Sequence, residues 1–209
     1  MLSVIMTDAA LTPTEADALL RHGVERSFNC ISVDGHMSTS DTVLLLANGC
    51  AGNALLKPGH PDWPAFVAAL EGVTFRLAMA MVRDGEGAQK FVTVTVQGAR
   101  SAADAEAAVR SVANSFLVKP SWVGTYPNWG RLMDALGYSA AKVDESKVEI
   151  RYNRLLAVRN GLKAGASIEQ LSRVVAQKEF AITIDLHLGR HAATVYSCDC
   201  TEEYVRINK

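Results

Sequence analysis

The strongest constraint on the fold comes from two segments in which apolar residues alternate with polar or smaller ones. The segment "KFVTVTVQG" alternates Val92, Val94 and Val96 with Thr93 and Thr95. Further along, "FAITIDLHLG" alternates large apolar residues with smaller or polar neighbours in the same way. Because successive side chains of a strand point to opposite faces, each segment predicts a half-buried β-strand that needs cover on one face.

Segments with helical spacing separate the strands and can supply that cover. Two capping boxes, Thr12–Glu15 and Ser167–Gln170, mark helix starts, and the first predicts a helix over about residues 13 to 28. Further helices are expected over about residues 62 to 82 and within "YPNWGRLMDALG". Another is expected to begin at a cap, Ser101 or Asp104, and to carry Val109, Val112 and Phe116 at helical spacing.

Two continuous apolar runs predict further strands. The run "TVLLLA", residues 42 to 47, has the length of a buried strand, and the chain opens with the β-leaning "MLSVIM". Short strands are also expected at 31–33 and in "KVEIRYN", and the last segment, "AATVYSCDCTEEYVRIN", begins as a strand. With no repeat or linker, residues 1–209 are predicted to form one cooperative α+β unit in which helical layers cover sheets. The apolar opening leaves two readings: a strand begins at once, or something upstream has been removed.

Composition excludes several classes of partner. The formal net charge is −1, from 21 basic and 22 acidic residues, and no polybasic run offers a case for nucleic acid or anionic membrane. We expect no apolar stretch close to the roughly 20 residues that span a bilayer. The chain has four cysteines, Cys30, Cys50, Cys198 and Cys200. They show neither a disulfide framework nor paired zinc spacing, so we expect a cytoplasmic chain with reduced thiols.

The familiar catalytic motifs are absent, so residue chemistry alone gives a weak functional prediction. "GEGAQK" precedes a strand, which is the wrong order for a dinucleotide site. His187 and His191 lie on either side of a glycine at a strand end, so their spacing does not indicate a metal site on a helix. Cys198 and Cys200 are interpreted as small packing residues in preference to metal ligands. Glu86 is read as a solvated acid on a flexible turn.

Two polar loops each allow a structural and a functional interpretation. The cluster from Asp34 to Thr42 builds a tight loop in the simpler interpretation and a site wall in the functional one. "PNWGR" either ties a loop down around Trp129 or places Asn128 and Arg131 at a site.

Several ungapped blocks resemble one family in order from Met1 to the end of the chain. They are "TDAA", "RSFNCISVDGHMSTSDTVLLLANG", "VRDGEGAQKF", "NSFLVK", "YPNWGR" and "CDCTEEYVRIN". These blocks resemble the β chain of the bifunctional ornithine acetyltransferase/N-acetylglutamate synthase family of arginine biosynthesis. The resemblance implies an αββα layered sandwich of the ornithine acetyltransferase/DmpA-like type, completed by a partner α chain in an α2β2 or larger assembly.

The resemblance also implies a mechanism. The family's precursor cuts itself before a threonine that becomes the nucleophile, and Met1-Leu2 matches the residues that usually follow it. No catalytic residue is therefore expected in this chain itself. The threonine passes an acetyl group from N-acetyl-L-ornithine to L-glutamate by a ping-pong mechanism. Its α-amino group, with a pKa of about 7.7–8.0, can serve as the base for its own hydroxyl.

Two substrate-binding residues carry over by resemblance. Glu86 matches the family's glutamate, which suits a cationic amine, and Asn208 matches its asparagine, whose amide can donate and accept. The oxyanion-stabilising Thr-Gly pair and a substrate-binding lysine belong to the α chain. No cofactor or metal is expected, and acetyl-CoA is a candidate co-substrate because some members accept it.

The sequence departs from the family pattern in places, and two other functions stay open. The chain stops at Lys209, Tyr126 replaces the usual acid before "PNWGR", and His36 and Met37 replace smaller or acidic residues. These changes leave substrate preference and acetyl-CoA use open. The alternatives are an N-terminal-nucleophile aminopeptidase or amidohydrolase, and a non-catalytic binding subunit.

Overall fold

The structure, a computed structural model, describes residues 1–209 as two compact units. The N-terminal unit comprises residues 1–30 and 36–80, and the C-terminal unit comprises residues 31–35 and 81–209. The division does not test whether the chain unfolds as one cooperative unit, so that expectation stays a prediction.

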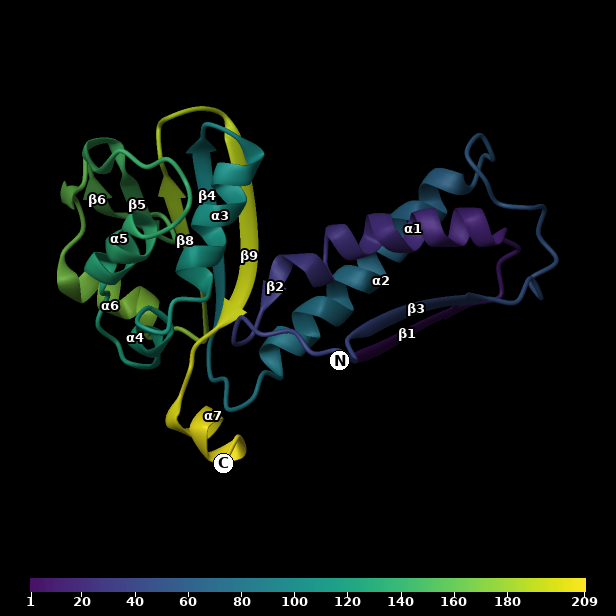
Figure 1. The fold of residues 1–209 in the computed structure, drawn as a ribbon, viewed down its shortest axis with the longest axis horizontal. Helices are drawn as coiled ribbons and strands as arrows, with labels where there is room; N and C mark the ends of the chain where they lie inside the picture. Colours follow the sequence, from purple (N-terminus) through teal and green to yellow (C-terminus); the bar gives the residue numbers. More distant parts are fainter. The chain divides into compact units, whose positions relative to one another are not determined.

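The N-terminal unit is a two-stranded parallel sheet covered by two long helices (Figure 1). Its elements are β1 (Leu2–Thr7), α1 (Pro13–Glu25), a 3₁₀ turn (Phe28–Cys30), β3 (Thr42–Ala47) and most of α2 (Trp63–Arg83). Ile5 of β1 lies opposite Leu45 of β3 and forms a buried cluster with Leu19 and Leu70 of the two helices. The helices approach closely at Gly23, where an added Cβ would lie 3.1 Å from Thr74 Cγ2.

Both predicted apolar strands of this unit form, but their burial differs from the prediction. The bounds predicted for "TVLLLA" are confirmed, whereas its reading as a buried strand is wrong within this chain. Helices cover only one face of the sheet, so every second side chain stays exposed. The exposed side chains are Leu2, Val4, Met6, Leu44 and Leu46.

Helix α2 contradicts the expectation that no apolar stretch approaches membrane-spanning length. It has 21 residues and a mean hydropathy of 1.6 over its most apolar window, which suffices by length and composition alone. A single such helix is weak evidence, because the core helix of a soluble protein passes the same test. Phe66, Val67 and Val73 of α2 pack on the buried cluster of the N-terminal unit, although only 28% of the apolar window is buried within this chain.

The C-terminal unit is built on a seven-stranded mixed sheet in the order β2-β9-β4-β8-β5-β6-β7. Its strands are β2 (Ile31–Ser32), β4 (Phe91–Ala99), β5 (Glu149–Tyr152), β6 (Leu155–Arg159), β7 (Leu162–Lys163), β8 (Glu179–Asp185) and β9 (His191–Cys198). Its helices are α3 (Ala102–Ala113), α4 (Lys119–Val123), α5 (Trp129–Gly137), α6 (Ile168–Val175) and α7 (Glu202–Ile207), with a 3₁₀ turn at Glu145–Lys147.

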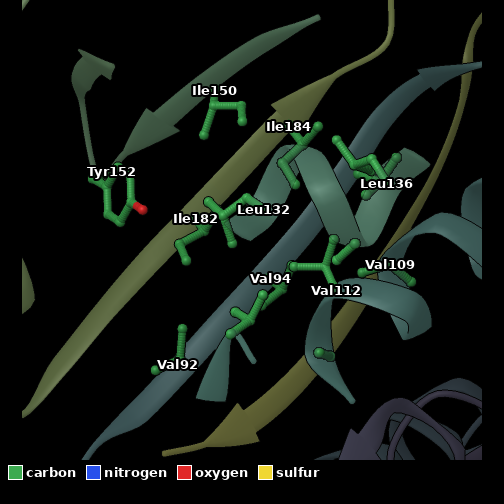
Figure 2. Packing of buried hydrophobic residues seen from close by; sticks show 14 of the residues in the cluster. Val92, Val94, Val109, Val112, Leu132, Leu136, Ile150, Tyr152, Ile182 and Ile184 are labelled. Carbon is green, nitrogen blue, oxygen red and sulfur yellow. The ribbon is translucent and has the colours of Figure 1, made fainter. Parts of the chain in front are cut away.

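The core of this unit lies between the sheet and the helices on one of its faces (Figures 1 and 2). The predicted alternation is confirmed, since Val92 and Val94 of β4 and Ile182 and Ile184 of β8 are fully buried. Side chains of α3 and α5 meet them, including Val109, Val112, Leu132 and Leu136 (Figure 2). The opposite face carries half-buried threonines, and Thr95 and Thr194 pair through their hydroxyls at 2.9 Å. The mixed α+β class with helices layered on sheets is confirmed.

Local predictions succeed where capping chemistry is explicit. Ser101 and Ser167 cap α3 and α6 as predicted, and the Ser167 capping box is complete. Phe116 is a correction, because α3 ends at Ala113 and the Phe116 side chain is exposed beyond it. The first helix ends at Glu25 instead of residue 28. Besides the two 3₁₀ turns, four helices and strands were not predicted, each of them short: α4, β6, β7 and α7.

Candidate functional site

Glu86 lies on the tight turn that joins α2 to β4. The turn is closed by backbone hydrogen bonds from Gly85 N to Val82 O (3.3 Å) and from Ala88 N to Gly85 O (2.9 Å). Gly87 has a positive φ of 67°, and a Cβ there would lie 2.7 Å from Tyr204 N. Only glycine allows both this conformation and the close approach of the turn to α7.

The chain that follows β9 ties this turn in place from the other side. Asp199, 2% exposed, accepts hydrogen bonds at Oδ1 from the backbone nitrogens of Gln89 (2.8 Å) and Lys90 (3.0 Å). Thr201 donates its hydroxyl to Gly87 O at 2.7 Å, although it occupies the N-cap position of α7. The two contacts fix the backbone on both sides of Glu86, so its carboxylate projects from an anchored turn.

Asn208, at the end of α7, contacts Glu86 directly. Its side-chain nitrogen Nδ2 donates to Glu86 Oε2 at 2.5 Å and to Tyr204 O at 2.9 Å. The two sequence-predicted site residues are 122 positions apart and are brought together by α7. Both are exposed, so the carboxylate and the amide are accessible to a ligand.

A tyrosine–aspartate pair, which the sequence did not reveal, stands beside this contact. The Tyr204 hydroxyl donates to Asp34 Oδ2 at 2.9 Å. The bond to Asp34 raises the pKa of Tyr204, and the nearby Glu86 carboxylate adds to that effect. Tyr204 is therefore a neutral donor at physiological pH. The pair joins positions 170 apart, which no local spacing could indicate.

A buried lysine lies against the end of β9, next to the segment that holds the Glu86 turn. Lys119, 3% exposed, donates through Nζ to Ser197 Oγ at 2.9 Å and to Cys198 O, and lies 5.7 Å from the centre of the Trp122 ring. Burial lowers the pKa of Lys119, and neighbouring thiols and carboxyls, Cys198 foremost, oppose that effect. The lysine satisfies polar groups at the end of β9, just before the segment that holds the Glu86 turn.

The predicted packing role of the cysteines agrees with their surroundings. Burial raises the pKa of the thiols of both Cys198 and Cys200, so both are protonated near neutral pH. All four cysteines are free. No group of three or more His, Cys, Asp or Glu side chains is arranged to hold a metal ion, and His187 instead lies 3.4 Å from Asp185.

The polar loops divide between the two interpretations that the sequence allowed. Asp41 accepts from the Met1 backbone nitrogen (2.7 Å) and from Ser38 N (3.0 Å) and Oγ (2.9 Å), so this part of the loop is a tight turn. Asp34, by contrast, joins the candidate site.

The "PNWGR" segment has a structural role, because its polar side chains bond to the backbone around α5. Asn128 caps α5 by accepting from Arg131 N at 3.3 Å, and Arg131 Nη1 donates to Leu117 O at 2.8 Å. Neither residue reaches the contact between Glu86 and Asn208.

The geometry suits the recognition of a cationic amine. Carboxylate and amide oxygens both accept from an ammonium group, and the carboxylate adds the charge that strengthens such bonds. Asp34 and Glu86 both raise the pKa of Tyr204, so both carboxylates lie within electrostatic range of its phenol. The site is therefore a candidate amine-binding corner built from α7 and the turn before β4.

Comparison with known proteins gives one consistent family. The model of the ArgJ family matches residues 1–209. A relative in Geobacter sulfurreducens, named arginine biosynthesis bifunctional protein ArgJ, is 47% identical over 209 residues, which are all of this chain and 53% of that protein. A relative in Schizosaccharomyces pombe, named as the mitochondrial form, is 38% identical and is covered over 48% of its length.

A solved structure extends the similarity to three dimensions. The crystal structure of arginine biosynthesis bifunctional protein argJ from Bacillus halodurans superposes with a TM-score of 0.92 at 35% identity. The match covers all of this chain and 98% of that chain. The chain thus spans about half the length of the curated relatives it matches and nearly the whole of one separately solved chain.

Proposed function

Because the chain belongs to the ArgJ family, we propose that it is the β chain of a glutamate N-acetyltransferase. The enzyme moves an acetyl group from N-acetyl-L-ornithine to L-glutamate through an acetyl-threonine intermediate. The nucleophile is a threonine immediately before Met1, exposed by self-cleavage of a longer precursor. Its own α-amino group removes the hydroxyl proton. Neither a cofactor nor a metal takes part, and acetyl-CoA is a possible second acetyl donor.

The observation that carries this proposal is the contact between Glu86 and Asn208. The two residues that match the family's substrate contacts are 122 positions apart in the chain, yet Asn208 Nδ2 lies 2.5 Å from Glu86 Oε2. In the proposed reaction this pair binds the α-nitrogen of ornithine, which takes up protons as it leaves, and then that of glutamate, whose ammonium gives up a proton before it attacks the acetyl-threonine. A single amine site suits a ping-pong mechanism, in which the two amino acids occupy the enzyme one after the other.

The uncovered sheet of the N-terminal unit supports a partner chain. Parallel sheets occur almost only where both faces are covered, and here five apolar side chains remain exposed on one face of β1 and β3. The matched relatives are about twice as long as this chain. We propose that the preceding half of the precursor, the α chain, covers this face in an α2β2 or larger assembly. The free cysteines favour the cytoplasm as its compartment.

The test uses the full precursor, expressed and allowed to process. Sequencing the amino terminus of the smaller fragment should give threonine followed by Met1-Leu2. Purified enzyme is then incubated with N-acetylornithine that carries labelled acetyl. Without glutamate the label should stay on the protein at no more than one acetyl per β chain, and added glutamate should receive it. Release of the label as acetate would support an aminopeptidase or amidohydrolase, and a protein that never takes up label would be a binding subunit.

Glu86→Gln tests the site itself. Glutamine keeps an acceptor for Asn208 but removes the negative charge, so KM for both amino-acid substrates should rise about tenfold or more. Asp84→Asn is the matched control, since Asp84 is an exposed acid in the same turn. Equal kinetics for the two variants would remove Glu86 from substrate binding.

A further inference from the structure

We propose that Tyr204 is a positioning residue, which holds the Asn208 amide so that its oxygen, together with the Glu86 carboxylate, accepts from the substrate ammonium. This inference rests on the function proposed above and adds Tyr204 and Asp34 to the residues that the reaction depends on.

The orientation of the Asn208 amide follows from its contacts. An amide nitrogen has two N–H groups, and Asn208 Nδ2 lies 2.9 Å from Tyr204 O and 2.5 Å from Glu86 Oε2. Both partners are acceptors, so the nitrogen must occupy this position and the oxygen Oδ1 must point elsewhere. Asn208 N also donates to Tyr204 O at 3.3 Å, which fixes the backbone of Asn208 to the same carbonyl.

Tyr204 in turn is fixed by the site. Helix α7 has only six residues, a length that gives little stability by itself. Tyr204 is the one residue of α7 that is not exposed. Its hydroxyl is bonded to Asp34 at 2.9 Å, and its backbone nitrogen faces Gly87 of the opposing turn. The bond from phenol to carboxylate therefore anchors the helix that carries Asn208.

The arrangement defines the ligand by its donors. A primary ammonium has three N–H groups and can bond to Glu86 and Asn208 Oδ1 at once. If α7 were free to shift, the amide could still contact Glu86, but its oxygen would no longer be held beside the carboxylate. Tyr204 thus affects binding of the amine and leaves the acetyl-transfer chemistry alone.

The experiment is a double-mutant cycle on the processed full-length enzyme. Tyr204→Phe removes only the hydroxyl and should raise KM for L-glutamate and N-acetylornithine about tenfold, with kcat within twofold. Asn208→Ala should do the same. In the Asn208→Ala background, Tyr204→Phe should have little further effect, because the residue through which Tyr204 acts is gone. Tyr138→Phe, which alters an exposed phenol in the same unit, is the control.

A conservative variant provides a graded response. Asp34→Asn keeps an acceptor for the phenol but removes its charge, so its effect on KM should be smaller than that of Tyr204→Phe. Unchanged KM in Tyr204→Phe would overturn the inference, as would full additivity with Asn208→Ala, even if the variant melts at a lower temperature. Uptake of labelled acetyl from N-acetylornithine by the unmutated enzyme, and its transfer to L-glutamate, separate this failure from another. Absence of both would overturn the proposed function and the role of Tyr204 together.

Discussion

The two sheets of this chain differ in what they present on the face that their own helices leave uncovered. The seven-stranded sheet presents half-buried threonines, two of which pair through their hydroxyls. The two-stranded sheet presents five exposed apolar side chains there beside the half-buried Thr42: Leu2, Val4, Met6, Leu44 and Leu46. A threonine hydroxyl can bond to a neighbour or to water, whereas exposed leucine and methionine lose about 25 cal/mol for each Å² left in water. The face of the two-stranded sheet is therefore the one that we propose a partner chain covers.

The largest effect is expected from a charge on the apolar face. Met6→Asp should prevent assembly with the rest of the precursor, because burying an unpaired carboxylate costs several kcal/mol, or more than about 100-fold in affinity. Leu162→Asp is the control, since Leu162 is 72% exposed on β7 and Met6 is 76% exposed on β1. Co-purification of the two fragments measures assembly. If both variants assembled equally well, an exposed apolar side chain on β1 would matter no more for assembly than one on β7.

A smaller effect is expected from cavities in the two cores. Ile184→Ala, at a fully buried position of β8, should lower the free energy of unfolding of the C-terminal unit by about 2–4 kcal/mol. Ile5→Ala, at 7% exposure in β1, should cost the isolated chain about half as much, because its sheet is packed on one face. Hydrogen exchange in peptides from β8 and β1 measures each unit separately. A larger loss in β1 would reverse the comparison.

Alkaline titration should distinguish the C-terminal unit by its buried lysine. Burial lowers the pKa of Lys119, so between its folded and unfolded values the unfolded chain binds more protons and stability rises with pH. Burial raises the pKa of Cys198, so the unfolded chain loses that proton first and stability falls above about pH 8.5.

Lys119→Met should remove the rising contribution and steepen the alkaline loss of stability by up to about 1.4 kcal/mol per pH unit. Urea unfolding between pH 8 and 10.5 checks this, with Lys142→Met as an exposed control. Parallel profiles for Lys119→Met and the unmutated chain would contradict it.

The smallest effect on stability is expected from the threonine face. The double variant Thr95→Val/Thr194→Val replaces both partners of one hydroxyl pair, which should change the free energy of unfolding by less than about 0.5 kcal/mol. The sheet would then resemble the two-stranded one in surface chemistry, so the chain should self-associate at lower concentration. Sedimentation velocity detects this, and an unchanged distribution would mean that the threonines do not keep this face solvated.

Sequence patterns predicted local structure well and burial less well. The strand "TVLLLA" has the predicted bounds because apolar β-branched and aliphatic runs favour strands. Its exposure could not be predicted, since a continuous apolar run implies cover on both faces and does not say which molecule supplies it. The prediction for Phe116 was wrong for a related reason. The helical spacing of apolar residues continues in the sequence past Ala113, where α3 ends.

The candidate site shows a similar limit. By residue chemistry Glu86 was only an acid on a turn, and the resemblance to a family was needed to pair it with Asn208. The pairing of Tyr204 with Asp34 depends on tertiary structure across 170 positions. One signal was available, however: Thr201 followed by Glu202 and Glu203 is a typical helix start and could have predicted α7.

The open face of β1 and β3 also bears on how such a protein can be made in a cell. A fragment released with this face bare would be prone to aggregation and would need chaperones. In the precursor that we propose, both halves are translated as one polypeptide, which removes that stage because the tether supplies the second half in equal number and at millimolar effective concentration. Cleavage after folding therefore leaves the two chains in equal amounts, because both come from one message and no two messages have to be translated at matched rates.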